Sequence, residues 1–250
     1  MKSKPSSYQS LKTVLKHVDF NLREKFPEKP ANLRNTRNYI GLFLLTALTF
    51  YIIGALVQQR TQNYKNAKKP FLDWRDEGVV GPVKDQGNCN ASYAFAAISA
   101  IESMYAIANG QLLSFSEQQI IDCLGGCAIE SDPMMAMTYL ERKGIETYTD
   151  YPFVGKKNEK CEYDSKKAYL ILDDTYDMSD ESLALVFIDE RGPGLFTMNT
   201  PPSFFNYKSG IYNPTEEECK STNEKRALTI VGYGNDKGQN YWIVKGSFGT

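Results

Sequence analysis

Nineteen consecutive residues without a charged side chain, Tyr39 to Val57, divide the chain into a short N-terminal tail and a longer C-terminal part. At about 1.5 Å per residue, a helix of this length spans roughly the 30 Å hydrocarbon core of a bilayer. A helix buried in a globular domain is disfavoured because the segment has no polar face. A cleaved signal peptide is the alternative, but 38 residues precede the segment and it is long for such a peptide. We predict one transmembrane helix over residues 39–57.

The flanks of this segment are both basic. Residues 1–38 form a basic tail with nine Lys and Arg residues against three acidic ones, and a polar linker follows at 58–69. Because the linker is also basic, the positive-inside rule separates the two orientations only weakly. The five cysteines all lie beyond the apolar segment, at Cys89, Cys123, Cys127, Cys161 and Cys219. Disulfides form in oxidising compartments, so we expect a cytosolic N-terminus and a C-terminal domain that is extracellular or in a lysosomal or secretory lumen.

The C-terminal part has the composition of a folded domain. Aromatic residues make up 12% of the chain and hydrophobic residues 42%, which is unlike a disordered protein. The formal net charge is −1. A chain without excess positive charge has no general attraction for nucleic acid, so no nucleic-acid partner is expected.

Helical patterns come first in this part and strand patterns follow. Apolar residues recur on one face from Ser92 to Ala108, residues 114–123 start with a possible capping box, and residues 132–144 end at a glycine. After Tyr169 the chain changes to short β-like runs between turn signals, at 168–174, 194–199, 210–214, 226–234 and 240–248. Helices followed by strands predict an α+β domain with two lobes.

Several short stretches, in order, resemble the papain-like cysteine peptidases. They are DWR (73–75), GPVKDQGNC (81–89), SEQQIIDC (116–123), YPFVGKKNEKC (151–161), GIYNP (210–214), VGYG (231–234) and NYWIVKGSFGT (240–250). The resemblance extends from about Pro70 to the last residue. It implies a papain-like domain at 70–250, with a helical lobe at about 85–168 and a β-barrel lobe at about 70–84 and 169–250. The family continues beyond the GSFGT motif, so we expect a barrel truncated at its C-terminus, with an open sheet edge beside residues 240–248.

In this family a cysteine at a helix N-terminus is held as a thiolate by a histidine. An asparagine orients the histidine, and a glutamine side chain helps to stabilise the oxyanion. The resemblance places Ser92 at the cysteine position, Arg226 at the histidine position and Gly246 at the asparagine position. Only the glutamine is kept, as Gln86.

The chain contains one histidine, His17, which lies before the apolar segment. Arginine stays protonated and accepts no proton, since its pKa is above about 12. We therefore predict a papain-family protein without catalytic residues, which binds a peptide or protein in its former cleft and needs neither metal nor cofactor. The alternatives are a hydrolase that uses Ser92 with an unorthodox base such as Lys225, and a truncated, non-functional product of a cysteine protease gene.

The resemblance also implies two disulfides, Cys89–Cys127 and Cys123–Cys161, and leaves Cys219 as a free thiol. It brings Arg226 within a few ångströms of Ser92 and close to Phe248, where we expect the guanidinium to meet an aromatic ring or a carboxylate. Asn90-Ala91-Ser92 is a sequon for N-glycosylation and the only one in the chain. It is either a glycan site at the former cleft or a chance sequon that is never used.

Overall fold

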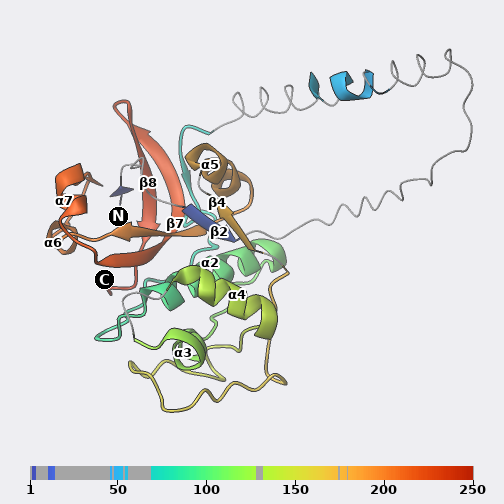
Figure 1. Cartoon of the computed structure of the whole chain (residues 1–250), viewed down its shortest axis with the longest axis vertical. Helices are drawn as coiled ribbons and strands as arrows, with labels where there is room; N and C mark the ends of the chain where they lie inside the picture. The colour runs from blue at the N-terminus through green and yellow to red at the C-terminus, as the bar shows by residue number, and fades with distance from the viewer. Residues whose placement is uncertain are drawn as a thin grey trace, which may run out of the picture. The chain divides into compact units, whose positions relative to one another are not determined.

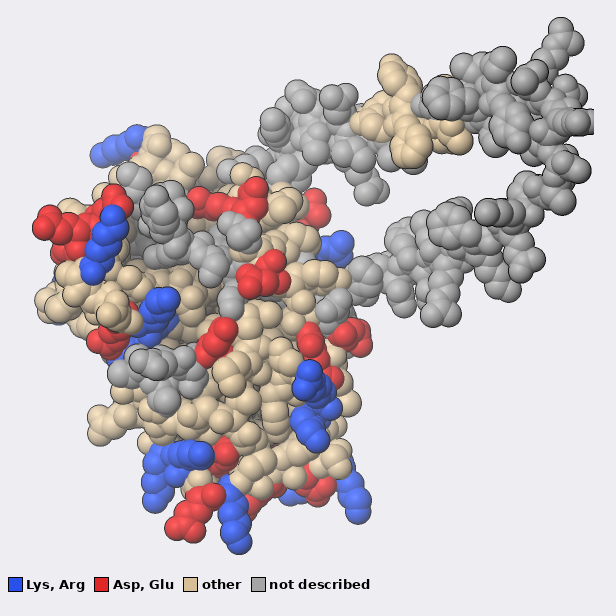
Figure 2. Space-filling view, viewed as in Figure 1, with Lys and Arg blue, Asp and Glu red and all other residues tan. Residues whose placement is uncertain are grey.

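The computed structural model describes residues 2–3, 11–14, 46, 48–52, 54–55, 69–127, 132–173, 175–178 and 180–249 (Figure 1). The described residues from position 70 onward belong to one compact unit. On the face shown in Figure 2, charged side chains of both signs are interspersed. The mixed helix-and-sheet architecture that the sequence predicts is confirmed.

The first half of this unit is helical. Its elements are α2 (Ser92–Asn109), α3 (Glu117–Ile120), the π-helical turn η1 (Ile121–Gly125) and α4 (Pro133–Lys143). The long helix α2 is buried on most of its surface and packs against both α4 and the sheet. It ends where Gly110 takes a left-handed conformation, with φ of 70°, and donates its N–H to the carbonyl oxygen of Ala106.

The predicted capping box at α3 forms only in part. Ser116 accepts a hydrogen bond from the backbone N–H of Gln119 at 2.9 Å, as the pattern predicts. The side chain of Gln119 does not return the bond to Ser116. Its amide oxygen accepts from the backbone N–H of Glu146, and its amide nitrogen donates to the carbonyl oxygen of Gly144. Gln119 therefore holds the end of α4 against α3 instead of completing the cap.

The second half is built on a sheet in the order β4-β2-β5-β7-β8-β1-β6, with β3 also paired to β7. The strands are β1 (Lys2–Ser3), β2 (Leu11–Val14), β3 (Leu72–Asp73), β4 (Thr175–Met178), β5 (Gly194–Asn199), β6 (Ile211–Tyr212), β7 (Lys225–Asp236) and β8 (Gln239–Lys245). Strand β7 is buried from Arg226 to Gly234 and lies against α2. It is the element that joins the two halves.

Two expectations for this half are wrong. Residues 168–174 form no extended strand, because only Leu170 makes a β-bridge there, to Ile145. Helices also lie between the strands: α5 (Glu181–Glu190), α6 (Pro202–Phe205) and α7 (Glu216–Lys220). Asp180 caps α5 by accepting from the backbone N–H of Ser182 and Leu183.

The N-terminal tail contributes two of the strands. Strand β2 pairs antiparallel with both β4 and β5, and β1 pairs antiparallel with β8 at Trp242 and Ile243. The expectation of an open edge is therefore wrong at these two residues of β8. Pairing of β2 with β4 also requires residues 11–14 to lie on the same side of any membrane as the folded domain, whereas the topology predicted from the sequence separates them.

The predicted transmembrane segment, 39–57, lies largely outside the described residues. Its described positions, 46, 48–52 and 54–55, are helical and exposed. Across the described parts of the chain, no helix combines the length and the apolar character needed to cross a membrane.

Two apolar cores correspond to the helical and sheet halves. The first contains Ile98, Phe115 and Leu140, and the second contains Phe196, Ile230 and Trp242. Both predicted disulfides, Cys89–Cys127 and Cys123–Cys161, are present and lie in the helical half. All five cysteines are among the described residues, and Cys219 is the free one, as the sequence predicts.

Candidate functional site

Ser92 is the first residue of α2, directly after a loop that the Cys89–Cys127 disulfide anchors. The side chain is buried, with 5% of the residue exposed. Its Oγ accepts a hydrogen bond of 3.1 Å from the backbone N–H of Ala227 on β7. The hydroxyl is thus engaged by the opposite half of the domain.

Arg226 precedes Ala227 on β7, and its guanidinium is held on three sides. Nη1 donates to Oδ1 of Asn90 at 3.0 Å, and Nη2 forms an ion pair with Glu224. The guanidinium carbon lies 6.0 Å from the ring centroid of Phe205. The side chain is 9% exposed, and Nε has no partner among the described residues. The structure therefore brings the Ser92 and Arg226 positions together.

The expected partners of Arg226 are right in kind and wrong in one identity. A carboxylate and an aromatic ring both contact the guanidinium, as predicted, but the ring belongs to Phe205 and not to Phe248. Phe248 packs edge-to-face on Phe205, with ring centroids 6.0 Å apart. Phe248 is thus one ring removed from the guanidinium.

Gly246 follows the end of β8, beneath the ring of Phe248. A Cβ atom at this position would lie 2.7 Å from Cε2 and 2.8 Å from Cδ2 of that ring. Real Cβ atoms essentially never approach other atoms this closely. The position at which the family places its orienting asparagine has no room for a side chain unless Phe248 moves.

Gln86 is buried and fixed by Ser247. Its Oε1 accepts a hydrogen bond of 2.6 Å from the Ser247 hydroxyl, and its backbone N–H donates to the Ser247 carbonyl oxygen at 2.9 Å. Because the amide oxygen is used in this way, the amide nitrogen remains the group with which Gln86 can donate. This is the polarity that stabilisation of an oxyanion requires.

Lys225 does not supply the missing base. It is exposed at the start of β7. Successive residues on a strand point to opposite faces, so Lys225 points away from the face on which Arg226 meets Asn90. The site therefore holds an oxyanion donor and a hydroxyl, but no proton acceptor suited to activate that hydroxyl.

Residues 69–250 match the family model described as papain family cysteine protease. The chain belongs to the papain family. It is 36% identical to mouse pro-cathepsin H over 202 residues, which cover 75% of this chain and 60% of the relative. It is 34% identical to a cathepsin L-like proteinase of Fasciola hepatica over 188 residues, 72% of this chain and 56% of the relative.

Solved structures agree with this assignment. The digestive procathepsin L2 proteinase from Tenebrio molitor larval midgut superposes with a TM-score of 0.67 at 36% identity, covering 73% of this chain and 59% of that one. Procathepsin L 3 from the same source gives a TM-score of 0.64 at 30% identity, covering 73% of this chain and 62% of that one. The chain thus spans a little over half the length of these papain-family relatives.

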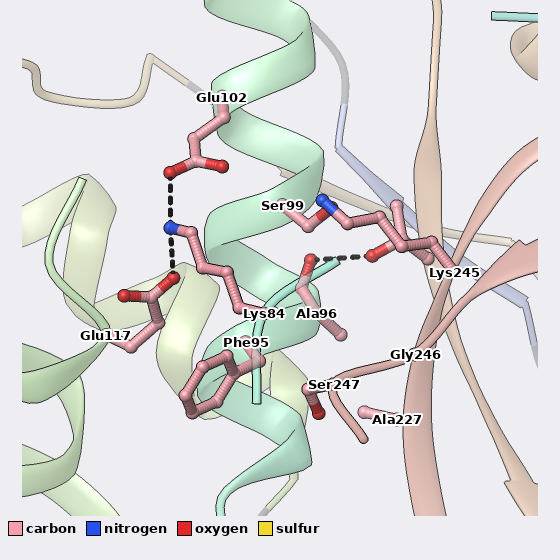
Figure 3. Close-up of a pocket in the computed structure, with 11 residues that line it drawn as sticks. Lys84, Phe95, Ala96, Ser99, Glu102, Glu117, Ala227, Lys245, Gly246 and Ser247 are labelled. Atoms are coloured by element: carbon pink, nitrogen blue, oxygen red, sulfur yellow. Dashed lines mark hydrogen bonds and ion pairs between the residues drawn. The ribbon is translucent and has the colours of Figure 1, made fainter. Parts of the chain in front are cut away.

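A buried ionic cluster lies behind the papain-family site, where a small pocket extends from Ala227 and Ser247 to Lys84 (Figure 3). Nζ of Lys84 donates to Glu102 at 2.8 Å and to Glu117 at 2.5 Å. Lys245, at the end of β8, lines the same pocket from the sheet side. Two cations and two anions therefore meet where the two halves of the domain join.

Burial and charge act against each other in this cluster. Burial lowers the pKa of Lys84, but Glu117 and Glu102 outweigh it, so the pKa is raised. Burial raises the pKa of Glu117, and the nearby Glu102 charge adds to this more than Lys84 can offset. Burial lowers the pKa of Lys245. One shared lysine cannot compensate two buried carboxylates fully.

Sequence reasoning missed the residues that surround the former catalytic positions. Asn90 was treated only as a glycan acceptor, while Glu224, Phe205 and Ser247 were not singled out. No local pattern marks these four residues, because each acquires its role from a partner distant in sequence or from a turn. The cluster around Lys84 carried a weak signal, since Glu117 follows the N-cap Ser116 of a short helix.

Proposed function

We propose that this protein is a catalytically inactive member of the papain family. The observation that carries the proposal is the occupant of the base position. Arg226 is there, bound to Asn90 and Glu224, and residues 18–250 contain no histidine. The Ser92 hydroxyl has no group to take its proton. An oxyanion donor alone leaves a rate enhancement on the order of 10³-fold over water.

The test is hydrolysis of a broad fluorogenic peptide library by the purified protein, with Ser92→Ala as control. We expect no turnover above that of Ser92→Ala, and no labelling of Ser92 by a fluorophosphonate probe in the folded protein. Turnover or labelling that disappears in Ser92→Ala would instead establish the serine hydrolase.

We propose further that the protein acts by binding a peptide or a protein segment along its former cleft. Ser92 and Arg226 are buried and bound to each other's surroundings, so a ligand would contact the cleft walls more than these two residues. Phe205 and Phe248 are the exposed aromatic groups beside them, at 52% and 40% exposure. Aromatic side chains of this kind commonly dominate the free energy of peptide binding.

This binding is measured with an immobilised peptide library, followed by titration of the retained sequences. Phe205→Ala should weaken binding by about tenfold or more, the size of a moderate hot spot. Leu183→Ala, which removes a similarly exposed apolar side chain from α5, should leave the affinity unchanged. Equal effects of the two substitutions would exclude the cleft as the binding site.

We also propose that residues 39–57 anchor the domain in a membrane. The support is the length of this uncharged segment. The pairing of β2 with β4 and β5 opposes an N-terminus across the membrane from the domain. Epitope tags at the two ends, tested by protease protection in sealed vesicles, decide the matter. Tags on opposite sides support the anchor, and tags on the same side reject it in favour of the strand pairing.

A further inference from the structure

We propose that Asn90 carries an N-linked glycan that lies beside the former active site. Asn90-Ala91-Ser92 is the only sequon in the chain. It directly precedes and enters helix α2, so Asn90 stands two residues before the position of the papain-family nucleophile. The proposal does not depend on whether the protein is inactive. It depends only on the folded domain entering the secretory pathway.

The geometry of the Asn90 amide leaves its nitrogen available. Oδ1 accepts the hydrogen bond from Nη1 of Arg226, which fixes the orientation of the amide. Nδ2 lies on the other side of the amide carbon and has no hydrogen-bond partner among the described residues. It is also absent from the set of fully buried unpartnered side-chain atoms, which comprises Ser99 Oγ, Glu117 Oε2 and Arg226 Nε. Nδ2 therefore keeps access to solvent, as the attachment atom of a glycan must.

The rest of the sequon is buried in the folded domain. Ala91 is 0% exposed and Ser92 is 5% exposed, with its hydroxyl bound by Ala227. A modifying enzyme can reach both residues only before β7 packs against α2. The timing is therefore that of chain translocation, in the same oxidising compartment that the two disulfides require.

The reaction transfers a sugar from a lipid carrier. Nδ2 of Asn90 attacks the anomeric carbon of an oligosaccharide linked to a polyprenyl diphosphate. The new C–N bond forms as the bond from that carbon to the diphosphate oxygen breaks, Nδ2 loses one proton, and the polyprenyl diphosphate leaves. Because Oδ1 takes no part in the bond, its contact with Arg226 can persist in the modified protein. The glycan would then extend from the rim of the site and restrict access to Ser92.

The experiment expresses the full chain in eukaryotic cells and compares its gel mobility before and after treatment with a peptide N-glycosidase. We expect a mobility shift for the wild type and for Ser92→Thr, which keeps the sequon. The shift should be lost in Asn90→Gln and in Ser92→Ala. The loss in Ser92→Ala separates modification of this sequon from any other effect of changing Asn90.

A matched control makes every outcome informative. Lys208→Thr completes a second sequon that begins at Asn206, and both residues are exposed. If this variant gains a glycan while Asn90 carries none, the native sequon is not used and the proposal is overturned. If neither position is modified, the domain does not enter the compartment, which overturns the proposal and the luminal location together. Neither result bears on the absence of peptidase activity, which the library assay measures separately.

Discussion

The ring of Phe248 occupies the space that any side chain at position 246 would need. Restoring the family residues at Ser92 and Arg226 would still leave the base without its orienting asparagine. We expect Ser92→Cys with Arg226→His to remain at or near background in a fluorogenic peptide assay. Robust turnover by this double variant would contradict the view that Gly246 and Phe248 disable the site as much as the lost nucleophile does.

The steric conflict itself can be measured as a free energy of unfolding. Gly246→Asn should destabilise the domain by about 1–2 kcal/mol, because overpacking forces the Phe248 ring to move. Phe248→Ala in the same chain should recover much of this loss, giving a favourable coupling in a double-mutant cycle followed by urea denaturation. Additive effects would mean that the two positions do not compete for space.

Cys219 shows how its surroundings control a single thiol. Burial raises the pKa of this thiol, and the neighbouring carboxylates Glu218 and Glu216 raise it further. Only the thiolate reacts, so alkylation of the unreduced protein should be slow at neutral pH and accelerate above about pH 9. Glu218→Gln should speed the reaction at a given pH. Glu217→Gln, on the same helix, should not, and mass spectrometry should find Cys219 as the one labelled site.

At this scale the sequence predicted positions better than partners. The family motifs placed Ser92 and Arg226 together, and the spacing of the cysteines in the family correctly implied both disulfides. The ring on Arg226 was misassigned, because Phe205 reaches the guanidinium only through the packing of α6 against β7. Contacts of this kind depend on tertiary structure and leave no mark in the local sequence.

The elements follow the same division between local and distant causes. Helix α4 was predicted closely, since Asp132, Pro133 and Gly144 are strong boundary signals. Helix α5 was missed although Asp180 caps it, because its apolar run resembled a strand. The capping box of Thr215 and Glu218 at α7 was likewise visible and overlooked. Strands β1 and β2 had no local signal, because they join the sheet across more than 150 residues of chain.

The N-cap of α4 offers a test at the scale of one element. The Asp132 side chain accepts from the backbone N–H of Met134 at 2.9 Å, and the helix buries Met137 and Leu140 in the first core. Asp132→Ala should lower the free energy of unfolding by about 1 kcal/mol, the usual value of such a cap. Met135→Ala, at an exposed position of the same helix, should change it by less than about 0.5 kcal/mol. Similar losses in both would show that the cap is not the cause.

The whole molecule is joined across β7 and α2, where polar and ionic contacts supplement the two apolar cores. Thr229 on β7 donates to the carbonyl oxygen of Ala96 on α2, and the Ser92 hydroxyl accepts from Ala227. Lys84, Glu102, Glu117 and Lys245 extend this seam from the helical elements to β8 (Figure 3). The order of motifs predicted the two halves, but not the charged seam, whose members lie up to 161 residues apart (84 to 245).

This seam should give the stability of the whole domain a distinct dependence on pH. The pKa of Glu117 in the folded state is raised above its ordinary value of 4.5, with burial as the largest cause. Between the unfolded and folded pKa values, the native state therefore binds the proton more readily than the unfolded state. The contribution of Glu117 to stability is thus fully present below about pH 4.5 and is lost as the pH rises through the folded value. Lys84, whose pKa is raised from 10.5, stays charged throughout this range.

Glu117→Gln mimics the protonated carboxyl and should remove that dependence. We expect the variant and the wild type to be similar near pH 4.5. The variant should then become relatively more stable as the pH rises toward 8, by about 1.4 kcal/mol for each unit by which the pKa is raised. Urea denaturation across this range measures the difference, and Glu159→Gln, an exposed surface change, should keep a constant offset from the wild type. If the offset of Glu117→Gln is also constant with pH, Glu117 stays ionised in the folded domain and the seam is a fully compensated ionic network.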